Sequence, residues 1–221
     1  MPFTAYDFFA YLASGALVVA TVDVLHGKQW LLTKDHPLAL DVFLILVAYV
    51  LGHVIAQLSS TLIESLLVER GLLRPSYTLM GKSRPGFQHL FRLYCKALRT
   101  ETRERIIEQA RARAFAGSGE ALFLHAFGLV KVEPLTMARL DQFRNLYGFA
   151  RNMALSFFVV ALLIAIGPND ARPAIPAAWA WCCLGLGIVM LYRYLKFFRQ
   201  YSYEIFVTYA ELAPRAEGGG K

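Results

Sequence analysis

The chain has 221 residues, of which 57% are hydrophobic and 18% are charged, and its mean hydropathy is +0.43. Soluble domains have about 45–50% apolar and about 25% charged residues, so this composition excludes an ordinary soluble domain and indicates a membrane protein. The formal net charge is +7, and its distribution along the chain is more informative than its sum. The three cysteines, Cys95, Cys182 and Cys183, have neither the number nor the spacing of a disulfide framework or a metal site.

Four segments are long and apolar enough to be membrane spans, since a helix needs about 20 mostly apolar residues to cross a bilayer. In chain order they are 6–27, a segment that begins at Pro37, 153–168 and 173–192. The first lacks the basic start of a signal peptide, so we expect a retained helix. The predicted fold is all-α: a polytopic integral membrane protein with four transmembrane helices and a helical cytoplasmic insertion between spans 2 and 3.

The charge distribution predicts the orientation and the division of the chain. Residues 69–151 carry 15 Lys and Arg against 7 Asp and Glu, and together with the tail from Arg193 they hold 20 of the 23 basic residues. Basic residues favour the cytoplasmic side, so we expect a multi-pass protein of the bacterial inner membrane with both termini in the cytoplasm. The expected parts are transmembrane helices 1 and 2 in 1–68, a basic helical cytoplasmic segment in 69–151, transmembrane helices 3 and 4 in 152–192, and a cytoplasmic helix and tail in 193–221.

A charged amphipathic helix is expected early in the insertion. Thr100 is its candidate N-cap, it is predicted to end at Gly117, and Ile106, Ile107, Ala110 and Ala114 share one apolar face. Its charged face is either solvated or in contact with anionic lipid or a nucleotide. We favour the solvated face, because charge-rich helix faces usually have no partner.

Two further helices are predicted in the insertion. Residues 120–130 are almost wholly apolar but too short to cross a membrane, so we expect them to be buried or at the membrane surface. Within them, His125 is expected to be a core histidine, because no second ligand stands at metal spacing beside it. From residue 136 the pattern predicts one unbroken helix into span 3, with Leu140 and Tyr147 on its apolar stripe.

The segment after span 4, LYRYLKFFRQYSYEIFVTYAEL, alternates aromatic and basic residues. Such a pattern suits base stacking, and it also suits a helix that leaves the membrane through an aromatic belt. Because it directly continues an apolar span, we favour the membrane helix and expect no nucleic-acid partner. The candidate contacts to lipid or to a partner are Arg103, Arg105, Arg111, Arg113, Arg193, Lys196 and Arg199.

The most informative feature is a polar stripe in span 2, LGHVIAQLSSTLIESLL. On an α-helix, His53, Gln57, Ser60 and Glu64 lie within roughly 60° of arc. An unpaired polar group in hydrocarbon costs on the order of several kcal/mol, so this stripe must face protein or water. Either it forms hydrogen bonds to neighbouring helices, or stripes from several subunits converge on a wet path.

Three functions remain open, and we expect no catalytic residues, metal or cofactor, because the chain lacks the motifs of nucleotide, hydrolase and redox sites. The first is a homo-oligomeric pore or membrane-perturbing effector, gated through its cytoplasmic helices by a soluble partner or a small signalling ligand. The second is a non-conducting anchor or scaffold that recruits a soluble cytoplasmic partner. The third is an enzyme acting on lipid headgroups.

Small residues four apart, as at Ala10 and Ser14 or Cys183 and Gly187, suit the close helix packing of an oligomer.

Overall fold

The computed structural model of the chain describes residues 5–27, 37–82, 84, 86, 89–167 and 176–212, with the backbone alone for 5–7. The regular elements in these residues are all helices. The predicted end of span 3 at Pro168 and the predicted start of span 4 at Pro173 lie outside the described residues. So do five of the basic residues that bear on the orientation, namely Lys28, Lys34, Arg172, Arg215 and Lys221.

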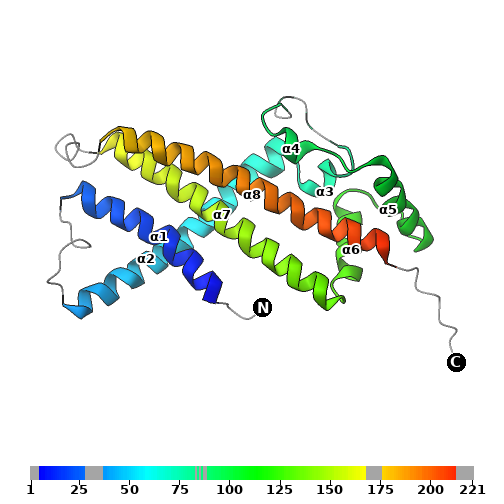
Figure 1. Cartoon of the computed structure of the whole chain (residues 1–221), viewed down its shortest axis with the longest axis horizontal. Helices are drawn as coiled ribbons and strands as arrows, with labels where there is room; N and C mark the ends of the chain where they lie inside the picture. Colours follow the sequence, from blue (N-terminus) through cyan, green and yellow to red (C-terminus); the bar gives the residue numbers. More distant parts are fainter. Residues whose placement is uncertain are drawn as a thin grey trace. The chain divides into compact units, whose positions relative to one another are not determined.

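In the described residues, four helices are long and apolar enough to cross a membrane, which confirms an all-α, multi-pass membrane protein (Figure 1). They are α1 (Ala5–Leu25), α2 (Leu38–Ser59) with its direct continuation, α7 (Pro134–Ile166) and α8 (Ala178–Glu211). The continuation of α2 is a π-helix, η1 (Ser60–Leu72). The remaining helices are α3 (Pro75–Thr78), α4 (Arg92–Cys95), α5 (Thr100–Ala112) and α6 (Glu120–Val130). The cytoplasmic location of the insertion stays a prediction.

The helices α7 and α8 are much longer than a membrane span requires. With 33 and 34 residues they each extend about 50 Å, against about 30 Å for a hydrocarbon core. In α7 the single proline is Pro134, at the first position, where a missing N–H costs nothing. The unbroken helix predicted from residue 136 into span 3 is therefore confirmed.

The chain folds into two compact units, each built from two separate stretches of sequence. Unit 1 comprises Met1–Ser65 and Asn145–Tyr194, and unit 2 comprises Leu66–Arg144 and Leu195–Lys221. Both α7 and α8 contribute residues to each unit.

In unit 1, α1 and α2 cross at backbone contact (Figure 1). A Cβ at Gly52 would lie 1.9 Å from the backbone oxygen of Tyr11, and a Cβ at Gly15 would lie 1.8 Å from that of Ala48. Any side chain at either position would therefore force the helices apart. Such close approach through small residues is the usual way that apolar helices associate within a bilayer.

The part of α7 in unit 1 contacts the other three spans. Ser156 donates a hydrogen bond to the backbone oxygen of Ser14 in α1 at 3.1 Å, and Asn152 bonds to α2. On α8, Gly187 leaves room for the ring of Phe158, which a Cβ would approach to 2.5 Å. Ser14 and Gly187, which were candidates for contacts between subunits, are thus used to pack helices within one chain.

Unit 2 has a hydrophobic core of its own, assembled from α5, α6, the start of α7 and the end of α8. Its fully buried side chains include Ile106 of α5, Leu140 of α7, and Phe206 and Tyr209 of α8. The aromatic residues of the tail therefore belong in part to a protein core. Phe206, Tyr209 and the unit 1 residue Tyr194 are buried and do not form a surface on which bases could stack.

The helix α5 confirms the predicted element but corrects its ends. It spans Thr100–Ala112, and the capping position falls on Arg99, whose side chain makes no cap bond. At the other end, Ala114 adopts a positive φ of 53°, and the N–H of Phe115 donates to the oxygen of Ala110 at 2.9 Å. This pair of features is a Schellman motif, which ends the helix before the glycines that were expected to stop it.

The apolar face predicted for α5 is confirmed in part. Ile106 and Ala110 are buried, whereas Ile107 is 38% exposed, and Ala114 is exposed and lies beyond the end of the helix. The helix α6 has the bounds that the apolar run predicts, and it buries Leu122 and Ala126.

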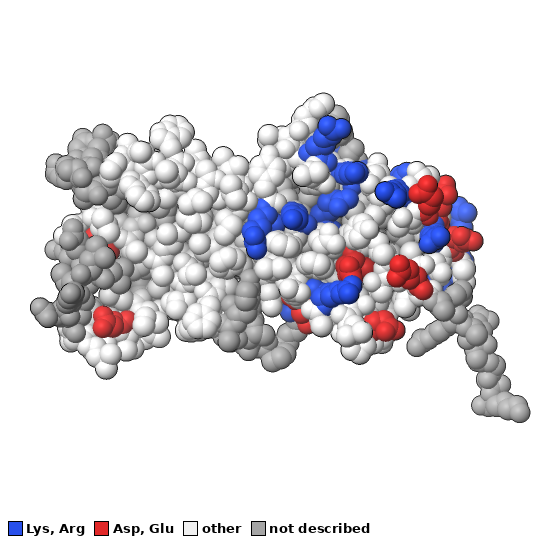
Figure 2. Space-filling view, in the orientation of Figure 1, with Lys and Arg blue, Asp and Glu red and all other residues white. Residues whose placement is uncertain are grey.

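In Figure 2, charged side chains gather over the elements of unit 2, while the visible surface of the unit 1 helices carries few.

Candidate functional site

A polar cluster lies in unit 1 at the point where α2 passes into η1. Ser59 is the last residue of α2 and is fully buried, and Asn152 of α7 is 4% exposed. Ser59 donates a hydrogen bond to Oδ1 of Asn152 at 2.7 Å. Arg151, the preceding residue of α7, donates from Nε to Oγ of Ser59 at 3.2 Å.

The cluster also contains an ion pair. Nη1 of Arg151 lies 2.5 Å from Oε2 of Glu64, and the two side chains are 15% and 29% exposed. Ser60 donates to the same carboxylate oxygen at 3.4 Å. A charge removed from water without a partner costs several kcal/mol, and here each charge is the other's partner. The pair therefore joins the α2–η1 helix to α7.

The polar stripe divides into two halves. Ser60 and Glu64 are half-buried and paired within the chain, whereas His53 and Gln57 are exposed. The α-helical period used to place the stripe is wrong from Ser60 onward, because η1 is a π-helix with more residues per turn. Beyond Ser60, the smaller rotation per residue places Glu64 at a different angle around the helix than the α-helical period predicts.

His53 lies in an aromatic group on the α1–α2 pair. Its ring stacks on Tyr11 of α1 at a centroid distance of 4.1 Å and meets the edge of Tyr49 at 4.7 Å. Among the described residues, no hydrogen-bond partner is present for the His53 imidazole or for the Gln57 side-chain amide. Both groups therefore have free polar atoms on the outer surface of a single chain.

Three of the predicted basic contacts are occupied within unit 2. The guanidinium of Arg113 lies 5.4 Å from the ring of Tyr209 and donates to the backbone oxygen of Leu212 at 3.5 Å. Arg199 donates to the backbone oxygen of Lys96 at 2.9 Å. Arg103 lies against the turn at Gly81, and its buried Nε has no hydrogen-bond partner among the described residues. These three side chains support the fold.

The other four predicted contacts are exposed. Arg105 and Arg111 lie on α5, and Arg193 and Lys196 lie on α8. Lys196 is 5.9 Å from the ring of Phe197. In the described ranges, no group of three or more His, Cys, Asp or Glu side chains is placed to hold a metal ion.

Arg151 and Asn152 were not among the site residues predicted from the sequence, and the structure places both against α2. Two adjacent polar residues at the start of an apolar run are a signal for an internal polar contact. Their partners, 92 and 93 residues away, cannot be identified without the tertiary structure.

Comparison with known protein families, curated proteins and solved structures finds no match to this chain. In the polar stripe, Ser60 and Glu64 take part in contacts within the chain. His53 and Gln57 are exposed on the surface of a helix long and apolar enough to span a membrane.

Proposed function

We propose that the protein forms homo-oligomers in the bacterial inner membrane, in which the exposed His53–Gln57 surface of α2 borders a polar path between copies. Unit 2 lies on the cytoplasmic side together with both termini, and it controls whether the path is open. The protein acts as a pore or membrane-perturbing effector and performs no enzymatic step.

The exposure of His53 and Gln57 carries this proposal. Polar side chains that face lipid are rare in spans, and most face protein or a water-filled cavity. The stacking on Tyr11 covers one face of the imidazole but provides no partner for its nitrogen atoms. A second copy, or water between copies, would supply hydrogen bonds that one chain does not.

Cross-linking tests the assembly. In a variant with Cys95, Cys182 and Cys183 replaced by Ser, Gln57→Cys should form disulfide-linked dimers in native membranes. The matched control is Leu58→Cys, since Leu58 is 48% exposed and points about 100° around the helix from Gln57. Equal cross-linking at both positions, or none at Gln57→Cys, would contradict an interface on this surface.

Conductance tests the polar path. Purified wild-type protein in planar bilayers should carry current, and Gln57→Leu should reduce it, because an apolar constriction loses water. Leu58→Val should leave the current unchanged. If the wild-type protein carries no current but Gln57→Cys still cross-links, the pore is contradicted and the oligomer is supported.

A non-conducting anchor is the second candidate, and the Glu64–Arg151 pair favours it. In the pore model Glu64 was expected to line the polar surface, but here its charge is matched within the chain. An anchor would present unit 2 to a soluble cytoplasmic partner and would show assembly without current. The two bilayer outcomes above separate these functions.

A further inference from the structure

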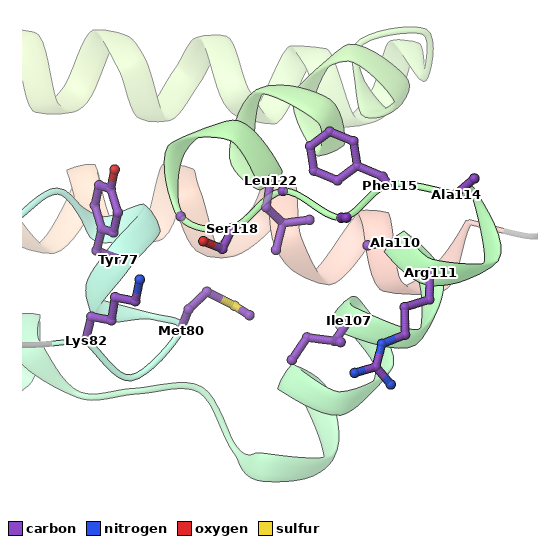
Figure 3. A pocket seen from close by; sticks show the side chains of 13 residues that line it. Tyr77, Met80, Lys82, Ile107, Ala110, Arg111, Ala114, Phe115, Ser118 and Leu122 are labelled. Carbon is purple, nitrogen blue, oxygen red and sulfur yellow. The ribbon is translucent and has the colours of Figure 1, made fainter.

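A hollow of about 630 Å³ lies within unit 2, between the turn after α3, the helix α5 and the loop that leads into α6 (Figure 3). Its size is within the range of about 300–1,000 Å³ that is typical of small-molecule sites. Its lining residues are Tyr77, Met80, Lys82, Ile107, Ala110, Arg111, Ala114, Phe115, Ala116, Gly117, Ser118, Gly119 and Leu122.

The rim at Gly117 and Gly119 is closely fitted to its neighbours. Gly119 has a φ of +61°, and a Cβ there would lie 2.3 Å from the ring of Tyr77. A Cβ at Gly117 would lie 2.4 Å from the ring of Phe115. A side chain at either glycine would displace an aromatic ring that lines the hollow, so the shape depends on both.

The charged lining is entirely basic. Lys82 and Arg111 lie on different sides of the hollow, with Met80 and Ile107 between them (Figure 3). Within the described part of the chain, neither basic side chain forms an ion pair, and Lys82 contacts only the ring of Tyr77, at 5.9 Å. Both charges therefore remain available to an anion.

The acidic residue that follows the lining residue Gly119 is paired with an arginine outside the lining. Glu120, the first residue of α6, pairs with Arg74, which also binds Glu69 at 2.5 Å. Among the described residues that line the hollow, none is a carboxylate. The N-terminal end of α6, which adds a partial positive charge, lies at the same rim.

Apart from Ser118, the other side chains of the lining are mostly apolar. Met80, Ile107 and Leu122 come from three different segments, and Tyr77 and Phe115 add aromatic surface. Ile107 is the residue of α5 that the core leaves partly exposed. A wall of this kind binds an acyl chain or a flat ring and has little affinity for a bare anion.

We propose that this hollow binds a phosphate-bearing amphiphile, with the phosphate held by Lys82 and Arg111 and the apolar body against Met80, Ile107 and Leu122. The proposal adds the ligand to the function proposed above and rests on it only for the consequence of binding. Binding itself is measured without reference to conduction, so failure of either proposal is seen separately.

Calorimetry on the full chain in phosphatidylcholine nanodiscs provides the test, with empty nanodiscs subtracted. The probes are a short-chain acylglycerol phosphate, adenosine monophosphate, inorganic phosphate and the uncharged acylglycerol. At least one of the two phosphate amphiphiles should bind about tenfold or more tightly than either inorganic phosphate or the uncharged acylglycerol. The tighter of the two distinguishes a lipid source from a nucleotide source.

Variants locate the binding. The double variant Lys82→Gln with Arg111→Gln should weaken the binding of the amphiphile about tenfold or more, because both charge-assisted hydrogen bonds are lost. Ile107→Trp should also block it, by filling the hollow without altering its charge. Arg92→Gln, an exposed change on α4 outside the hollow, should have no effect. The proposal is overturned if wild-type protein binds neither amphiphile, or if Arg92→Gln weakens binding as much as the double variant.

Discussion

Glu64 and Arg151 are two charges that depend on each other inside a membrane-spanning unit. The two residues are 87 positions apart in the sequence and form an ion pair. Ser59 and Asn152, which are hydrogen-bonded to each other, lie beside it. A pair of this kind is weak evidence for added stability, but the loss of one partner leaves the other uncompensated. Replacing either residue alone is therefore expected to destabilise the protein.

A double-mutant cycle tests that dependence. Glu64→Gln and Arg151→Gln should each lower the stability of the protein in detergent by about 1–3 kcal/mol, because each leaves a charge without its partner. The double variant should lose less than the sum, with a coupling energy of about 1 kcal/mol or more. Thermal unfolding followed by circular dichroism measures all three. Strict additivity would show that the two charges act independently.

His125 offers a second prediction at this scale. Its ring stacks on Phe115 at 4.2 Å and meets Tyr209 edge-on at 5.8 Å, and its buried Nε2 has no hydrogen-bond partner in the part of the chain that the structure describes. His125→Phe should therefore preserve or raise the melting temperature, since it keeps the ring contacts and removes an unsatisfied polar atom.

His125→Ala is the control for the stacking, and it should cost about 2–4 kcal/mol through the cavity it leaves. If His125→Phe were as destabilising as His125→Ala, the imidazole nitrogen would have a role that the ring contacts do not explain.

At the scale of elements, α1 and α2 depend on glycine where their backbones touch. Gly52→Ala places a Cβ against the backbone of Tyr11, so the helices must separate, and the yield and melting temperature of the folded protein should fall. Gly185→Ala in α8 is the matched control, because a Cβ there meets nothing within 4 Å. That change should be neutral or stabilising by about 0.5–1 kcal/mol, from helix propensity.

Size-exclusion profiles and thermal unfolding of the two glycine variants compare them directly. Similar behaviour of Gly52→Ala and Gly185→Ala would mean that the α1–α2 crossing is looser than the structure has it.

At the scale of the whole molecule, the orientation of the chain in the membrane decides whether unit 2 has a cytoplasmic role. In a cysteine-free background, a single cysteine at Ser118 should be labelled only after the membrane is permeabilised, whereas cysteines at Lys34 and Asp170 should react from the periplasmic side. The reason is the 20-to-3 division of basic residues between the two sides. Labelling of Ser118→Cys in intact cells would reverse the topology and remove the cytoplasmic role of unit 2.

The sequence by itself determined the features that depend on local pattern. The apolar runs predicted four spans, the 120–130 run predicted α6, and the helical apolar stripe from residue 136 predicted one unbroken helix into span 3. Each of these follows from the length, periodicity or composition of one contiguous stretch, and so no partner had to be known.

Only the tertiary structure decided which polar groups are satisfied and which are open. The stripe of His53, Gln57, Ser60 and Glu64 is continuous in sequence, yet Glu64 is paired with Arg151 while His53 and Gln57 remain exposed. The hollow in unit 2 likewise combines Lys82 with Arg111 from separate segments. Such juxtapositions depend on how distant helices pack and on the π-helical turn after Ser59, and a single sequence records neither.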